Sequence, residues 1–137
     1  MLKKLFAILS LTMFVFCFYG IYIGAKPVFN GFSNEFELYF TYGSFGNNIV
    51  NVSAKEYAKF SGVKGESCIT REPYSAVLKA FNAKTVFTEE IEGGINYYAF
   101  SPNIRYRASV KGKTVNIHYF FGKNYSKVGT PLIFGSY

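Results

Sequence analysis

The chain carries few of the side chains that catalyse reactions or bind metals: one histidine, His118, and two cysteines, Cys17 and Cys68. Because Cys17 lies in an apolar N-terminal run, a nucleophile and base would have to be Cys68 and His118. No motif surrounds either residue, and a zinc site would need both of them plus a glutamate. We therefore expect no catalytic residue, no metal and no cofactor, and interpret His118 as part of a sheet. A minimal hydrolase using Cys68 and His118 is the less favoured alternative.

The acidic residues also give little support to catalysis. All eight are glutamates, which excludes Asp-centred triads and EF-hand calcium loops. Glu89, Glu90 and Glu92 cluster beside Gly93-Gly94, and paired carboxylates can hydrolyse glycosides when they face each other across a cleft. Here they crowd one expected turn, so we interpret them as a solvated hairpin end.

The basic residues form the strongest candidate for a binding site. The net charge is +7, and no acidic residue follows Glu92. Such a surface suits anionic polymers or lipid headgroups, although lysines on a sheet also protect its edges from pairing with other strands. The same charges, with many aromatic residues, would suit nucleic acid. The candidate binding residues are Arg105, Arg107, Lys111, Lys113, Lys123 and Lys127.

A β-hairpin over residues 104–121 is expected to position most of these charges. Polar and apolar residues alternate on both sides of Lys111-Gly112-Lys113-Thr114, which is the pattern of two half-buried strands around a turn. The alternation places Arg105, Arg107 and Lys111 on one face of the first strand. The inner face is expected to contact the main helix, and consists of Tyr106, Ala108, Val110, Val115 and Ile117.

The remaining elements predict an α+β domain. Tyr74, Val77, Leu78 and Phe81 form an apolar stripe after Pro73, which predicts the main helix, with Asn82 at its end. Ser53 and Glu56 have the spacing of a capping box before a short helix at 54–60. We expect a curled antiparallel sheet packed by one main helix and preceded by an N-terminal hydrophobic helix. Its other strands are predicted at residues 35–42, 49–52, 65–70, 84–91, 95–100 and 132–134, with a turn at 43–48.

The N-terminus predicts export. Lys3 and Lys4 precede residues 5–25, which carry no charge and are long enough for a bilayer. An uncleaved anchor and a cleaved signal peptide both remain open, because the run exceeds a usual signal while Gly24-Ala25 offers a weak cleavage site. The predicted organisation is 1–25 anchor or signal, 26–33 linker and 34–137 extracytoplasmic domain. The protein would then be single-pass in the cell membrane with its domain outside, or secreted.

The C-terminal third resembles the YwmB family, exported proteins of endospore-forming Gram-positive bacteria. The resemblance implies an α+β domain compared with the TATA-box-binding-protein fold, and an extracytoplasmic location, but no reaction. It covers roughly residues 70–137. The residues that carry it are Val115-Asn116-Ile117-His118, Val128-Gly129-Thr130-Pro131-Leu132-Ile133 and Tyr137, and more weakly Tyr98-Ala99-Phe100-Ser101-Pro102 and Phe81-Asn82-Ala83.

Together these features predict a non-enzymatic protein of the cell envelope. Its domain would bind a partner protein, an anionic wall polymer or lipid through the basic face, with residues 5–25 in the membrane. A nucleic-acid-binding module, by analogy of fold, is the alternative. It is disfavoured because an exported domain rarely meets DNA, and because fold alone does not define function.

Overall fold

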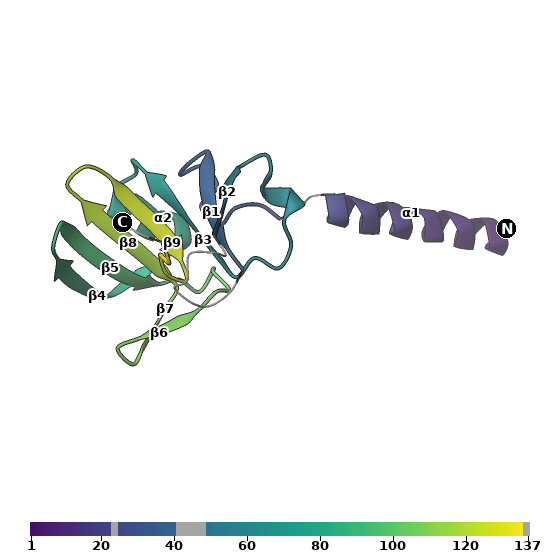
Figure 1. Ribbon diagram of the computed structural model, residues 1–137. Coiled ribbons are helices and arrows are strands. Elements are labelled where there is room, and N and C mark those ends of the chain that lie inside the picture. Colours follow the sequence, from purple (N-terminus) through teal and green to yellow (C-terminus); the bar gives the residue numbers. More distant parts are fainter. Residues whose placement is uncertain (23–24, 41–48, 136–137) are drawn as a thin grey trace.

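Seven antiparallel strands form one sheet, in the spatial order β2-β1-β3-β9-β8-β5-β4 (Figure 1). This is a computed structural model, and it describes residues 1–22, 25–40 and 49–135, the side chains of 15–22 excepted. The α+β class is therefore confirmed, whereas the predicted curl of the sheet is not found. The strands are β1 (Glu35–Tyr39), β2 (Ile49–Ser53), β3 (Gly65–Thr70), β4 (Lys84–Ile91), β5 (Gly94–Phe100), β8 (Ile117–Gly122) and β9 (Ser126–Thr130).

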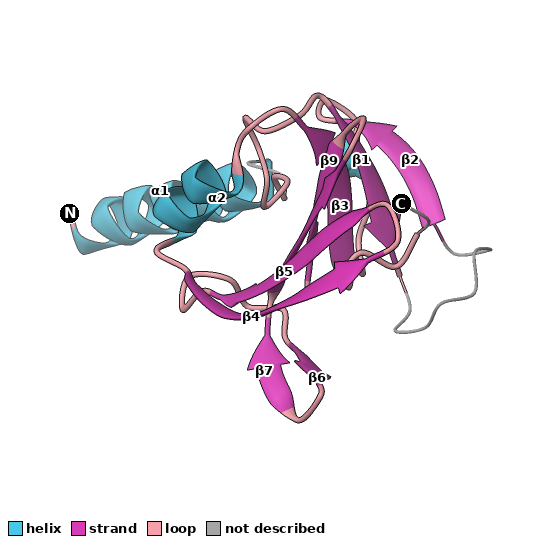
Figure 2. Ribbon diagram, turned by 90° about the vertical axis from the view of Figure 1, so that its left-hand side faces the viewer, coloured by secondary structure: helices cyan, strands magenta, loops and turns pink. Residues whose placement is uncertain are grey.

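Helix α2 (Tyr74–Phe81) covers one face of this sheet, as Figure 2 shows. Pro73 precedes its first turn, and Asn82 ends it in the left-handed conformation, φ 48°, where asparagine is tolerated. The Tyr74 ring lies 4.4 Å from the ring of Tyr97 on β5 and 5.3 Å from that of Tyr119 on β8. The helix therefore packs on the main sheet, and the expectation that it packs on the 104–121 hairpin holds only for the part of that segment that forms β8.

The predicted hairpin is shorter than expected and separate from the main sheet. Strands β6 (Ala108–Val110) and β7 (Lys113–Val115) pair only with each other, while residues 104–107 are irregular. Asn116 redirects the chain between β7 and β8. Its buried amide accepts from the Ser101 N–H at 2.7 Å and donates to the carbonyls of Ser101 and Ile104 at 2.7 and 3.1 Å. These bonds replace the ladder that a continuous strand would form.

The central strand β9 was not predicted, and the strand expected at 132–134 is absent from the described chain. Every residue of β9 is buried, including Lys127. After the Thr130–Pro131 peptide bond, which is cis, Ile133 lies over Gly129 and the Phe134 ring contacts Tyr39 at 5.1 Å. Residues 131–135 therefore cover the sheet face opposite α2 instead of extending the sheet.

The predicted helix at 54–60 is only a turn and a short 3₁₀ helix, Tyr57–Lys59. The capping contact is nevertheless present: Glu56 accepts from the Ser53 backbone N–H at 3.2 Å and its hydroxyl at 2.9 Å. Local capping therefore formed as expected, but the following residues do not present an apolar stripe long enough to continue a helix.

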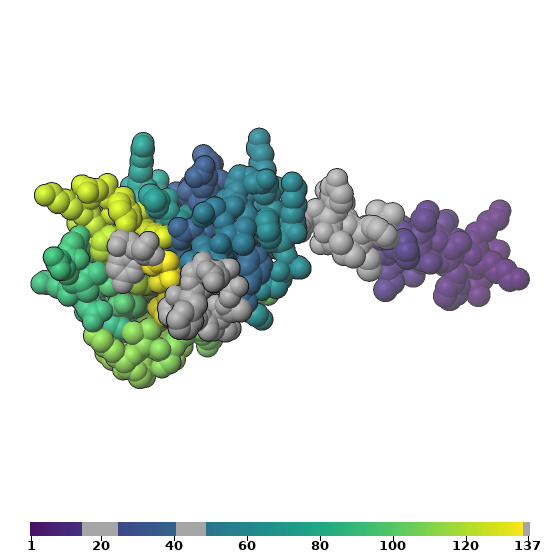
Figure 3. Space-filling view, viewed as in Figure 1, coloured from purple at the N-terminus to yellow at the C-terminus, as the bar shows by residue number. Residues whose placement is uncertain are grey.

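Helix α1 (Leu2–Tyr22) extends away from the domain (Figures 1 and 3), and the large apolar side chains among residues 1–14 are exposed. Among the described residues, no helix is long and apolar enough to cross a membrane. Part of the predicted 5–25 segment, including Cys17, lies outside the described side chains, as do the 43–48 turn and residues 136–137. The segment predicted as a linker contributes to the core, since its Phe29 is fully buried.

Candidate functional site

Four of the six predicted basic residues are exposed and lie within one short projecting segment, residues 105–113, and we call them the basic ribbon: Arg105, Arg107, Lys111 and Lys113. The last two flank the turn between β6 and β7, and the arginines lie in the irregular stem before β6. Figure 1 shows this two-stranded ribbon projecting from the end of the main sheet, and Figure 3 shows it as a lobe at the edge of the domain. The residues are brought together by sequence proximity, without a regular strand at the arginines.

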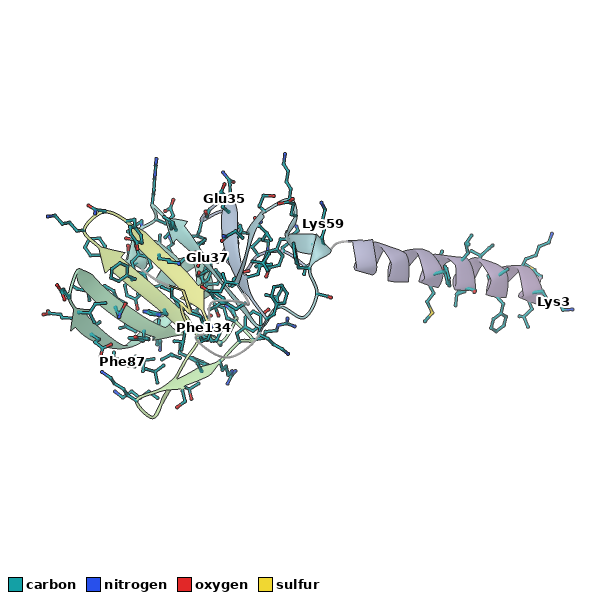
Figure 4. The ribbon with its side chains drawn as sticks, in the orientation of Figure 1. Lys3, Glu35, Glu37, Lys59, Phe87 and Phe134 are labelled. Carbon is teal, nitrogen blue, oxygen red and sulfur yellow. The ribbon has the colours of Figure 1, made fainter. Side chains whose placement is uncertain are left out.

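The basic ribbon is supported by aromatic rings. The Arg105 guanidinium lies 5.0 Å from the centre of the Tyr106 ring, and that of Arg107 lies 5.1 Å from the Phe100 ring. Lys111 and Lys113 both approach the Phe87 ring, at 5.7 and 5.6 Å, and Phe87 is labelled on β4 in Figure 4. Such contacts hold long cationic side chains near a surface while their charged ends remain in water.

One ribbon cation also has a carboxylate partner. Lys111 Nζ lies 2.6 Å from Glu89 Oε1, with 61% of the lysine side chain exposed. A pair this exposed contributes little to stability and does not hold the lysine away from a competing anion. Glu89 therefore reduces the net charge of the ribbon by one.

The other two predicted residues do not belong to this surface. Lys123 is exposed, but in the turn between β8 and β9. Lys127 is buried, with 4% of its side chain exposed, and its Nζ lies 2.7 Å from Glu37 Oε2. Lys127 is therefore not a ligand-binding residue of an exposed basic face. It was assigned wrongly because β9 is a central strand of the sheet and Lys127 points into a covered face.

That covered face holds a polar network which the sequence did not predict. Ser67 Oγ donates to Glu37 Oε2 at 3.0 Å, and the Tyr39 hydroxyl contacts both groups. Glu37, a member of the network, and Phe134, which packs on Tyr39, are labelled in Figure 4. Alternation along β1 places Glu37 and Tyr39 on one face, but only the strand order brings β3 and β9 beside them.

Serine, tyrosine and lysine side chains occur together in some active sites, yet this network does not fit one. Ser67 is fully buried, and Phe134 and Gly135 lie over the cluster. Burial chiefly raises the pKa of Tyr39 to about 12, so its phenol stays protonated at neutral pH and cannot act as a base. The arrangement is what a satisfied buried network requires.

Cys68 and His118 lie on opposite faces of the sheet. Ser67, Gly129 and His118 stand in register across β3, β9 and β8, so Cys68, the next residue after Ser67, points the other way. Cys68 is buried in the core beneath α2, and burial raises the pKa of its thiol to about 12. The two groups therefore do not form a nucleophile–base pair, and the thiol stays protonated.

His118 is a buried member of the sheet. Its Nδ1 accepts from the Ile133 backbone N–H at 3.2 Å, which places the proton on Nε2, 2.9 Å from Asn96 Oδ1. The ring stacks on Tyr98, which in turn stacks on Phe87, with ring centres 4.6 and 4.5 Å apart. Burial lowers the pKa of His118 to about 4, so the ring is neutral above that pH.

The glutamates near the Gly93-Gly94 turn do not converge. Glu89 contacts Lys111, while Glu90 and Glu92 are directed to solvent at the hairpin end. Across the ranges that the structure describes, no three histidine, cysteine or glutamate side chains gather as metal ligands would.

Glu66 carries a fully buried carboxyl group, which lies in the core beneath α2. Its Oε1 accepts from the Phe29 N–H at 2.9 Å, the Tyr57 hydroxyl lies beside it, and Oε2 has no hydrogen-bond partner. Burial is the main cause that raises the pKa of this carboxyl. A raised pKa means that the protonated acid is favoured in the folded state, so its contribution to stability is lost as the pH rises through that pKa.

Replacement of this carboxyl by an amide, Glu66→Gln, is therefore expected to stabilise the fold at pH 8. The gain is about 1–3 kcal/mol, the scale of a buried polar atom without a partner, and it should vanish near pH 4. Urea denaturation at both pH values measures it, with the exposed Glu35→Gln as control. A gain independent of pH would contradict this assignment.

Comparison with protein-family models, with curated proteins and with solved structures finds no match to this chain. The fold itself defines the class of protein: an antiparallel α+β domain with a projecting basic ribbon. The YwmB resemblance stays a prediction from the residues that carry it.

Proposed function

We propose that this protein is a non-enzymatic module of the cell envelope that binds an anionic polymer through its basic ribbon. The observation that carries the proposal is the presence of four exposed cations within residues 105–113, each placed over an aromatic ring. Within the described chain, Glu89 is the acid paired with this surface. Cations that neutralise the phosphates of a polyanion release the counterions condensed on it, so the affinity rises as the salt concentration falls.

The proposal also requires that the protein is exported, and only the sequence supports this part. Lys3 and Lys4 before the uncharged residues 5–25 are typical of an exported protein, whose domain would meet teichoic acids and lipid phosphates as polyanions beyond the cytoplasmic membrane. Cell fractionation with N-terminal sequencing of the mature protein tests both the location and any cleavage. Recovery of the unprocessed chain from the cytosol would refute this part.

Neutralisation of the ribbon by Arg105→Gln, Arg107→Gln and Lys113→Gln together should weaken binding to a polyglycerol-phosphate polymer. The slope of log affinity against log salt should fall by about two to three, since each cation contributes somewhat less than one. The matched control removes the same charge from exposed lysines elsewhere: Lys55→Gln, Lys64→Gln and Lys79→Gln. Fluorescence titration at several salt concentrations provides the measurement.

An equal loss of polymer affinity in the two triple variants would mean that net charge alone drives binding, and would refute the basic ribbon as the binding site. A single-stranded DNA oligonucleotide belongs in the same titration. Tighter and sequence-dependent binding of the oligonucleotide would favour the nucleic-acid alternative instead, because polymer phosphates carry no base edges to read.

A further inference from the structure

A cavity of about 680 Å³ lies on the α2 side of the sheet, away from the ribbon tip and the buried polar network. Its walls come from four segments: residues 25–28, the 3₁₀ turn with the following loop to Val63, the end of α2, and the loop 103–106. Figure 4 places Lys59, next to the lining residue Ala58, beside the end of α1. The volume falls in the range of natural ligand sites.

Apolar and polar side chains share the walls of this cavity, and the apolar ones come from all four segments. Val28, Phe60, Val63, Phe81 and Ile104 line it, and Phe81 also contacts the Phe29 ring in the core at 5.4 Å. Side chains of this kind suit a hydrocarbon chain, because each buried methylene raises affinity about fourfold.

The charged side chains that line the cavity are both cationic, and its neutral polar groups are Tyr57, Ser61, Asn103 and Tyr106. Lys26 and Arg105 line it, and no lining residue is acidic. The Arg105 guanidinium is positioned by a 3.2 Å hydrogen bond to the Tyr106 hydroxyl, which donates to the Val63 carbonyl at 3.1 Å. The charged side of the cavity is therefore positive, which favours an anion.

We propose that this cavity binds a single-chain anionic amphiphile, with its carboxylate or phosphate head at Lys26 and Arg105 and its chain between the apolar walls. This inference goes beyond polymer binding by the basic ribbon and does not depend on it. Because Arg105 belongs to both surfaces, the variants that test the cavity leave Arg105 intact.

Photo-crosslinking tests the proposal on the intact chain in phosphatidylcholine vesicles. The probe is dodecyl phosphate with a diazirine at the chain end, and the adducts are mapped by mass spectrometry. We expect adducts in residues 57–63 and 103–106. Unlabelled dodecyl phosphate or dodecanoate should compete, whichever of the two heads is preferred, and uncharged dodecyl glucoside should compete at least about threefold more weakly.

Two variants with matched controls make the test specific. Ala58→Trp fills the cavity and should remove most adducts, whereas Ala80→Trp, at an exposed position on α2 outside the cavity, should not. Lys26→Gln should weaken binding about three- to fivefold, the scale of an exposed ion pair, whereas Lys55→Gln should not. Loss of the near-ultraviolet circular dichroism of Ala58→Trp would show that this variant is not folded. In that case the comparison of Lys26→Gln with Lys55→Gln alone decides the test.

The proposal is overturned by adducts confined to residues 2–22, which would indicate adsorption to the apolar helix. It is also overturned if Ala58→Trp and Ala80→Trp give the same yield of adducts, or if Lys26→Gln and Lys55→Gln bind the probe equally well. Equal competition by dodecyl glucoside and dodecyl phosphate would overturn it too. None of these results would bear on polymer binding, which is measured without an amphiphile.

Discussion

Glu37→Gln is expected to lower the free energy of unfolding by about 2–3 kcal/mol, whereas Glu89→Gln lowers it by less than about 1 kcal/mol. The two pairs have nearly the same geometry: Lys127–Glu37 at 2.7 Å and Lys111–Glu89 at 2.6 Å. The glutamates are also equally exposed, at 32% and 34%, but the lysine side chains are 4% and 61% exposed. The pairs differ mainly in the burial of the lysine, and in the hydrogen bonds that Glu37 accepts from Ser67 and Tyr39, which its glutamine replacement can still accept.

The physical reason is the cost of a buried ammonium group without its counter-charge. The loss lies below that of a fully buried pair because Glu37 still meets water. Urea denaturation at pH 7 measures both variants. Adding Lys127→Met to Glu37→Gln removes the buried charge and should recover part of the loss. Equal losses of unfolding free energy in Glu37→Gln and Glu89→Gln would show that the ion pair with Glu37 does not stabilise Lys127. A further loss in the double variant Glu37→Gln, Lys127→Met would show the same.

The same lysine explains why the sequence did not reveal the centre of the sheet. Residues 126–130, Ser-Lys-Val-Gly-Thr, show neither alternation nor an apolar run, and a lysine usually marks an exposed position. Gly129 adds a weak strand former. The fold explains the presence of both residues: Lys127 pairs with Glu37 across β3, and Gly129 leaves space for Ile133.

Elements defined by local signals were predicted well. The main helix was predicted with the residues it has, 74–81, because Pro73, the apolar stripe and Asn82 all indicate the same element. Strands β3, β4 and β5 were likewise predicted to within a residue. The hairpin failed at Asn116 because its alternation continues across a residue whose side chain replaces the strand hydrogen bonds.

The candidate site was predicted only in part, for the same reason. Charges close in sequence, at 105–113, stay together because they share one short ribbon. The grouping of Glu37, Ser67 and Lys127 depends on the strand order β1-β3-β9, which joins distant segments and leaves no local pattern. The cavity beneath the 103–106 loop is likewise assembled from four separate segments.

His118 is expected to titrate in the folded protein with a pKa near 4, against about 6.5 when unfolded, because burial disfavours the charged ring. The unfolded chain then binds the additional proton between these two pH values. The contribution of His118 to stability is therefore fully present above pH 6.5 and is lost as the pH falls towards 4. The two pKa values correspond to at most about 3 kcal/mol.

The chain allows this prediction to be tested without ambiguity, because His118 is its only histidine. NMR signals of the imidazole follow the titration directly, and denaturation between pH 4 and 7 follows the stability.

Glu66 responds to pH in the opposite sense, so the informative quantity is the difference between the wild type and His118→Gln, which leaves Glu66 unchanged. The introduced amide would retain an acceptor for the Ile133 N–H, and the stability of this variant should depend less on pH. A measured pKa near 6.5, with parallel stability curves, would place His118 in water and detach residues 131–135 from the sheet.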